Sequence, residues 1–121
     1  MISRKAFIDK VNQEGFSFNI QIPWWWYKDF KLLVWKKRLS EEQLYQLFLS
    51  LCREVEGRRM QALEDERKYQ TGFYVVACNG REFRFEFVFK KNQQLRVFNL
   101  FETVNGRKKL TLMDLLDYIM D

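Results

Sequence analysis

The chain has 121 residues, 47% of them hydrophobic and 17% aromatic, and carries a formal net charge of +5. This composition excludes an intrinsically disordered chain and suits one folded domain, which we expect to span residues 1–121. Histidine is absent, which removes the commonest general base, the usual catalytic triad and most zinc sites.

The first third of the chain contains three short patterns of regular structure. Apolar residues recur at helical spacing across residues 3–13, with Ser3 as the N-cap, which predicts an amphipathic helix. Residues 16–22 alternate apolar and polar side chains as far as Pro23, which is typical of a half-buried strand. A second strand with mixed faces is predicted over residues 30–37.

The longest predicted helix begins at a capping box formed by Ser40 and Gln43. One apolar stripe at 3.6-residue spacing follows, and its members are Leu44, Leu47, Phe48, Leu51, Cys52 and Val55. The pattern continues as far as Leu63, with Gly57 as a bend or break. Three strands are then predicted, over residues 71–78, 81–90 and 95–101.

The middle one of these three strands is predicted to lie at the centre of the sheet. Its phenylalanines recur at every second position and share one face, and they are Phe83, Phe85, Phe87 and Phe89. Asn79-Gly80 predicts a type I′ hairpin turn, and Asn105-Gly106 marks another turn. Thr111 and Asp114 cap a final helix. The expected fold is α+β, with helices packed on a five-stranded antiparallel sheet in the order α-β-β-α-β-β-β-α.

The two cysteines and the amino terminus indicate a cytoplasmic setting. Cys52 and Cys78 lie among apolar residues, and we expect both thiols to be reduced. Charged residues interrupt the first ten positions, so no signal peptide is predicted. The longest apolar run covers residues 73–78, which is too short to span a bilayer, and no membrane partner is expected.

Charge is distributed unevenly along the chain. Residues 28–38 contain five basic residues and one acidic residue, a local charge of +4, and residues 90–109 contain six and one, a local charge of +5. Residues 40–66 are acidic, with seven acidic and three basic residues. This bipolar pattern weakens a purely nucleic-acid-binding interpretation and leaves open a homodimer that pairs acidic and basic surfaces.

No motif in the chain predicts a metal site, a cofactor or a catalytic centre. The five glycines are scattered and form no phosphate-binding loop. Glu82 and Glu86 share a strand face, but about 13 Å of strand and Arg84 separate them. A metal-free ribonuclease-like site remains an alternative, with Tyr69, Tyr74, Arg84, Glu86 and Arg96 as its candidates.

The strongest candidate for a working surface is the aromatic and basic segment that follows Pro23. Its partner-binding candidates are Trp24, Trp25, Trp26, Tyr27, Lys28, Lys36, Lys37 and Arg38. Consecutive residues of a strand or helix point in different directions, so one or two of the aromatic rings should be exposed. The alternative is that the rings close one end of the core while the lysines are a solvated edge.

A secondary basic patch is predicted from Lys90, Lys91, Arg96, Arg107, Lys108 and Lys109. We expect a small non-catalytic domain that docks onto another protein as an inhibitor, an immunity protein or an adaptor. The alternative is a nucleic-acid-binding module, with the metal-free ribonuclease-like toxin as its extreme form.

Overall fold

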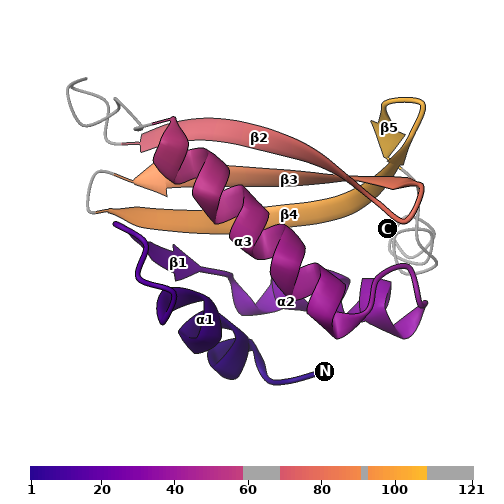
Figure 1. Ribbon diagram of the computed structural model, residues 1–121, viewed down its shortest axis with the longest axis horizontal. Coiled ribbons are helices and arrows are strands. Elements are labelled where there is room, and N and C mark those ends of the chain that lie inside the picture. Colours follow the sequence, from indigo (N-terminus) through magenta and orange to yellow (C-terminus); the bar gives the residue numbers. More distant parts are fainter. Residues whose placement is uncertain (59–68, 91–92, 109–121) are drawn as a thin grey trace.

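The computed structural model describes residues 1–58, 69–90 and 93–108, which form three helices and a five-stranded mixed sheet (Figure 1). The elements are α1 (Arg4–Asn12), β1 (Asn19–Gln21), α2 (Trp24–Trp35), α3 (Glu41–Gly57), β2 (Tyr69–Cys78), β3 (Arg81–Lys90), β4 (Gln94–Val104) and β5 (Arg107–Lys108). The predicted α+β class is confirmed. The sheet has five strands as predicted, but β5 is not one of the predicted strands.

The sheet has the order β1-β4-β3-β2, and β5 pairs with the end of β4. The β2–β3 and β3–β4 pairs are antiparallel as predicted, whereas β1 runs parallel to β4, with Ile20 opposite Leu95. The all-antiparallel prediction is therefore wrong. A parallel pair needs a long crossover connection, and α2, α3 and the first hairpin supply it between β1 and β4.

The strand predicted over residues 30–37 is also wrong, because most of this segment belongs to α2. Pro23 occupies the N-cap position, and Tyr27, Phe30 and Leu33 are buried at three-residue spacing. Apolar residues fill almost every position from 30 to 35, so neither helical nor strand periodicity stands out in the sequence. The segment forms a helix because the helix buries one of its faces in the core.

The order of elements changes accordingly to α-β-α-α-β-β-β-β among the described residues. The first strand is shorter than predicted, since only Asn19–Gln21 pair. The predicted final helix from Thr111 lies outside the described residues, as does the extension of α3 to Leu63.

The core lies between α3 and one face of the sheet. In Figure 1, α3 crosses in front of β2, β3 and β4, while α1 lies beside its first half. All members of the predicted α3 stripe and all four phenylalanines of β3 are buried. The capping box is confirmed. The backbone N–H of Gln43 donates to Ser40 Oγ, and the backbone N–H of Ser40 donates to Gln43 Oε1.

The predicted hairpin turns are present as well. Asn79 and Gly80 have φ angles of 53° and 72°, the positive values that a type I′ turn requires. Asn105 and Gly106 adopt the same region, with φ angles of 54° and 76°. Cys52 is buried and Cys78 half-buried, and both are free thiols.

Gly72 occupies a position in β2 where a larger residue does not fit. A Cβ atom there would lie 2.7 Å from Cζ of Phe87, whose ring is fully buried. We expect Gly72→Ala to lower the free energy of unfolding by about 1–3 kcal/mol, because the ring must move within a close-packed core. Urea denaturation followed by circular dichroism measures the change.

Gly57→Ala is the matched control for this substitution. A Cβ atom at Gly57 has no neighbour within 4 Å, and this glycine is the last residue of α3. Its replacement should leave stability unchanged or raise it by up to about 1 kcal/mol. Equal effects of the two substitutions would contradict the close approach of Gly72 to Phe87.

Candidate functional site

The outer side of α2 exposes large aromatic and basic side chains in one stripe. The stripe consists of Trp24, Lys28, Lys31 and Trp35, which recur at intervals of four, three and four residues and are all exposed. Trp24 is 70% exposed and Trp35 is 75% exposed. At ~1.5 Å per residue the stripe extends over about 16 Å, with an indole ring at each end.

The four consecutive aromatic residues at the start of α2 divide between solvent and core. Trp24 and Trp25 are exposed, Trp26 is half-buried, and Tyr27 is only 2% exposed. The Tyr27 ring packs against Phe7, and its hydroxyl donates to the Ile2 carbonyl oxygen at 2.7 Å. The cluster therefore anchors α2 through one ring and leaves two exposed at its amino-terminal end.

Trp24 and Trp25 form one wall of a hollow that we call the Trp–Arg hollow. Its volume is about 420 Å³, and its lining residues are Arg4, Ile8, Ile20, Gln21, Ile22, Pro23, Trp24, Trp25 and Arg96. The two indole rings meet edge to face, with centroids 5.8 Å apart. α1, β1, the start of α2 and the start of β4 all contribute to this hollow.

Two arginines give the hollow its positive charge. Arg4 Nη1 donates to the Ile22 carbonyl oxygen at 2.8 Å, which holds its guanidinium against the wall. Arg96 Nη2 lies 3.5 Å from Gln21 Oε1, and Arg96 Nε is buried with no hydrogen-bond partner among the described residues. Because a guanidinium carries five N–H donors, both arginines keep donors that can meet a carboxylate.

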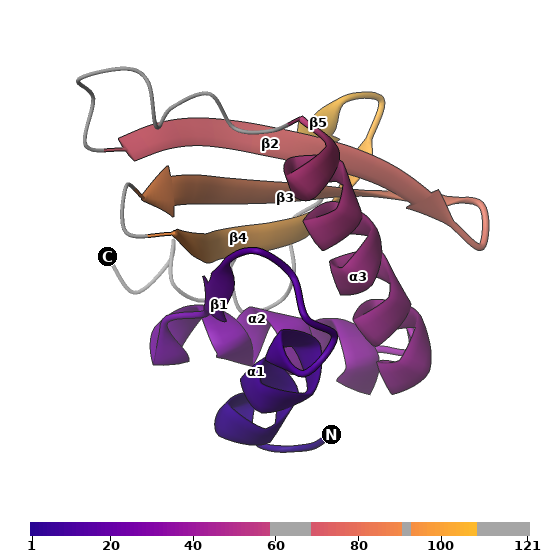
Figure 2. The same ribbon diagram turned by 60° about the vertical axis from the view of Figure 1, so that its left-hand side comes forward.

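The pairing of β1 with β4 places Arg96 at the hollow. Gln21, the last residue of β1, lies opposite Arg96 in the parallel register, and α2 begins three residues later. Figure 2 shows α2 beneath β4 and beside β1. Arg96 belongs to the predicted secondary basic patch, so the structure brings one member of that patch next to Trp24 and Trp25.

The remaining cations of the first basic segment lie at the other end of α2. Lys36 is the C-cap residue, and Lys37 follows with a φ angle of 57°. Arg38 Nε lies 3.9 Å from Glu102 Oε2, and Arg81 Nη1 is 3.1 Å from the other carboxylate oxygen of the same glutamate. Glu102 is 7% exposed, so Arg38 helps to neutralise a buried carboxylate.

The described members of the secondary basic patch do not form one surface. Lys90 lies opposite Gln94, at one end of the β3–β4 pair, whereas Lys108 lies opposite Thr103, near the other end of β4. Nine residues of strand separate those two positions on β4, a distance of about 30 Å. Arg107 precedes Lys108 on β5, and the predicted members Lys91 and Lys109 lie outside the described residues.

Among the candidates of the ribonuclease-like alternative, Arg84 and Glu86 form an ion pair of 3.4 Å, whereas Tyr74 and Arg96 lie elsewhere. Tyr74 packs on the α3 side of the sheet, where its hydroxyl lies 2.9 Å from Ser50 Oγ. Arg84 and Glu86 alternate with the buried phenylalanines of β3 and therefore lie on the opposite face of the sheet. Arg96 lines the Trp–Arg hollow. The sheet thus keeps the acid–base candidates Tyr74 and Glu86 apart.

Sequence reasoning missed Arg4 and the apolar wall of the hollow. Arg4 lies on the polar side of α1 and is one of many charged residues in the chain, so no local signal marks it. In the described ranges, no group of three or more His, Cys, Asp and Glu side chains is placed to hold a metal ion. No helix among residues 1–58, 69–90 and 93–108 is long and apolar enough to cross a membrane.

Comparisons with known proteins found no relative of this chain. No protein-family model matches the chain, and neither the curated proteins nor the solved structures contain a match. The chemistry of the Trp–Arg hollow is therefore interpreted from its own residues.

Proposed function

We propose that the chain is a small protein-binding domain of the inhibitor, immunity or adaptor type, which docks through the Trp–Arg hollow. One observation carries the proposal. Trp24 and Trp25 lie exposed beside each other, on the rim of a hollow that contains Arg4 and Arg96.

The exposed tryptophans have the properties of binding hot spots. Each indole has a large apolar surface and few rotatable bonds, so its burial in an interface releases water at a small cost in side-chain entropy. Tryptophan and arginine are both enriched among the residues that dominate binding energy at protein interfaces. Tyr27, on the same helix, fixes the helix to the core and limits its movement on binding.

The partner that fits this site is a protein with an acidic surface and a projecting apolar side chain. Arg4 and Arg96 supply donors inside the hollow, while Lys28 and Lys31 extend the positive charge along α2. Ile8, Ile20 and Ile22 line the rest of the hollow and favour an apolar group. A carboxylate close to an apolar side chain would meet both requirements.

Single-stranded nucleic acid is the second candidate, because exposed indoles beside arginines can stack bases and contact phosphates. Such a ligand favours a continuous basic groove. The described cations instead lie at several separate places: the hollow, the end of α2, and the two ends of the β3–β4 pair. This separation supports a protein partner over a nucleic-acid strand.

The double substitution Trp24→Ala/Trp25→Ala tests the proposed function. We expect the affinity for the partner to fall at least about 30-fold, since hot-spot residues contribute about 2 kcal/mol or more each. The variant should keep the circular dichroism spectrum of the unaltered chain, because both rings are exposed. Immobilised chain is incubated with nuclease-treated extract, and captured proteins are purified and titrated by calorimetry.

Trp35→Ala is the matched control for that experiment. Trp35 is on the same helix and is 75% exposed, but it lies about 16 Å from the hollow. We expect capture by Trp35→Ala to equal capture by the unaltered chain. If all three chains capture the same proteins equally, the hollow is not the docking site. If binding needs nucleic acid and falls steeply between about 50 and 200 mM salt, the second candidate is favoured.

A further inference from the structure

The stripe on the outer side of α2 consists of Trp24, Lys28, Lys31 and Trp35. At about 100° per residue, these four positions fall within an arc of about 60° around the helix axis, so their side chains project in one direction. Trp24 and Trp35 are the most exposed large hydrophobic side chains among the described residues, and both lysines are exposed as well. The stripe is therefore a narrow aromatic and basic surface that is directed away from the core.

The charge of the stripe is positive and is not balanced by neighbouring carboxylates. Among the described residues, neither Lys28 nor Lys31 has an ion-pair partner. Asp29, the acidic residue of α2, lies about 100° around the helix from Lys28 and is half-buried. Lys36 and Lys37 continue the positive charge at the carboxyl-terminal end of the helix. An anionic partner would therefore meet several ammonium groups along α2.

The spacing of the two indoles distinguishes between kinds of anionic partner. Their positions lie about 16 Å apart along the helix, with the two lysines between them. A protein hot spot concentrates its aromatic anchors in a central pocket, and lysine is depleted from protein interfaces. Single-stranded nucleic acid stacks successive bases on neighbouring rings. A flat surface instead contacts both ends of the stripe at once, and indoles together with basic side chains are typical of the membrane–water interface.

We propose that the stripe on α2 binds the headgroup region of an anionic lipid bilayer, with the helix axis parallel to the membrane plane. The indole rings of Trp24 and Trp35 enter the headgroup layer, where an amphipathic ring buries its apolar surface and keeps its N–H solvated. The ammonium groups of Lys28 and Lys31 reach the lipid phosphates on flexible stems. The net charge of +5 adds a long-range attraction to such a surface.

Binding at the membrane surface needs no membrane-spanning segment. The sequence predicts no membrane partner because no apolar run is long enough to cross a bilayer, whereas a surface helix stays at the level of the headgroups. Burial of Tyr27 and Phe30 fixes α2 to the core, so the stripe is formed before it meets a membrane. The inference is independent of the proposed function, because Lys28, Lys31 and Trp35 do not line the Trp–Arg hollow.

Co-sedimentation with vesicles tests the role of the charge. We expect the unaltered chain to bind phosphatidylcholine vesicles with about 30% phosphatidylglycerol at least about tenfold more strongly than pure phosphatidylcholine vesicles. Lys28→Gln/Lys31→Gln should lower the partition coefficient between the anionic vesicles and water at least about tenfold, since each cation contributes about fivefold. Lys90→Gln/Arg107→Gln is the matched control. It removes the same charge from β3 and β5 and should change the coefficient less than about threefold, because salt screens charges that lie away from the membrane.

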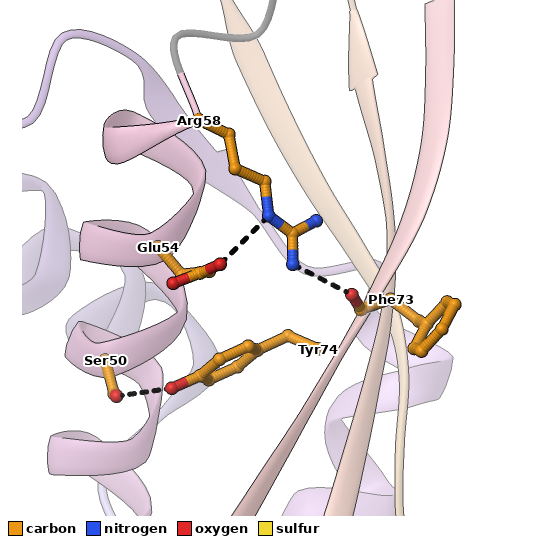
Figure 3. A network of polar contacts seen from close by, with 5 residues as sticks. All are labelled: Ser50, Glu54, Arg58, Phe73 and Tyr74. Atoms are coloured by element: carbon orange, nitrogen blue, oxygen red, sulfur yellow. Dashed lines mark hydrogen bonds and ion pairs between the residues drawn. The ribbon is translucent and has the colours of Figure 1, made fainter.

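Trp35→Ala tests the aromatic contact separately from the charge. We expect it to lower the same partition coefficient at least about fivefold, because the indole no longer transfers from water to the headgroup layer. Phe73→Ala is the matched control and should bind vesicles as the unaltered chain does. Phe73 is 53% exposed, but Figure 3 shows its ring on the side of β2 away from α3, and Figure 2 shows β2 at the edge of the sheet away from α2. Circular dichroism checks that every variant is folded.

The outcomes separate this inference from the proposed function. An unaltered chain that binds neither kind of vesicle, or both equally well, would overturn the inference, and so would stripe variants that bind as well as their controls. Trp35→Ala should weaken vesicle binding and still capture the protein partner. Loss of capture with unchanged vesicle binding would assign the stripe to a protein instead. A chain that binds anionic vesicles as described but captures no protein would support the inference and contradict the proposed function alone.

Discussion

Replacing Phe48 with alanine is expected to lower the free energy of unfolding by about 3–5 kcal/mol, the largest effect of any single substitution considered for this chain. Phe48 is fully buried in α3, and its ring meets three others. The centroid distances are 5.2 Å to Phe7 in α1, 5.6 Å to Phe30 in α2, and 5.2 Å to Phe85 in β3. The substitution therefore leaves a cavity where all three helices and the sheet meet.

A small domain has a total stability of about 5–15 kcal/mol, so the Phe48→Ala variant should be near the limit of folding. Urea denaturation followed by circular dichroism measures the loss. Trp35→Ala is the control, because it removes a larger ring that is 75% exposed and should change stability by no more than about 0.5 kcal/mol. A loss below about 1.5 kcal/mol for Phe48→Ala would show that its surroundings collapse or that the ring is not central.

The parts of the fold that could be predicted from sequence are those with a clear period. The α3 stripe repeats at helical spacing, and Ser40 and Gln43 mark where the helix begins. The phenylalanines of β3 recur at every second position, which predicted both the strand and its buried face. Asn79-Gly80 defined the hairpin between β2 and β3. In each case the local pattern is compatible with only one kind of secondary structure.

α2 shows where local patterns were insufficient. Nearly continuous apolar residues from 30 to 35 fit a strand as well as a helix, and β-branched or aromatic residues favoured the strand. Packing of Tyr27, Phe30 and Leu33 against the core favoured the helix. The error also moved Trp24 and Trp25 from a predicted connection to the first turn of α2, although their exposure agrees with what their spacing predicts.

Only the tryptophans of the Trp–Arg hollow could be predicted from the sequence, because its arginines join them through long-range contacts. Trp24 and Trp25 stand out by composition, but Arg4 and Arg96 join them through the parallel pairing of β1 with β4. That pairing connects segments about 75 residues apart, and no local signal encodes it. Arg38 is a second example. Its position in a basic segment suggested a partner contact, and no local signal predicted its ion pair with the buried Glu102.

Stability is expected to fall steeply above pH 10, because three buried groups stay protonated in the folded chain. Burial, with a smaller contribution from the charge of Glu41, raises the pKa of Tyr27 from 10.0 to about 12. Burial, assisted by the hydrogen bond to Glu14, raises the pKa of Tyr45 to about 12. Burial raises the pKa of the Cys52 thiol from 9.0 to about 12.

The sign follows from the protons bound in each state. Between the ordinary pKa and the raised pKa, the unfolded chain releases protons that the folded chain keeps, so a rise in pH favours unfolding. Each group can lower the free energy of unfolding by up to about 1.4 kcal/mol per pH unit in that window. The contribution of Cys52 should decline from about pH 9, and those of Tyr27 and Tyr45 from about pH 10. Urea denaturation at pH 8, 10 and 11 measures the decline.

Tyr27→Phe separates the titration of one group from general alkaline damage. At pH 8 the variant should be less stable by about 0.5–1.5 kcal/mol, because it lacks the hydrogen bond from the Tyr27 hydroxyl to the Ile2 carbonyl oxygen. Above pH 10 its stability should fall less steeply than that of the unaltered chain, since one ionising group has been removed, and the two curves should converge. Parallel curves from pH 8 to 11 would contradict the raised pKa of Tyr27, whereas convergence would identify the buried hydroxyl as a source of the alkaline instability.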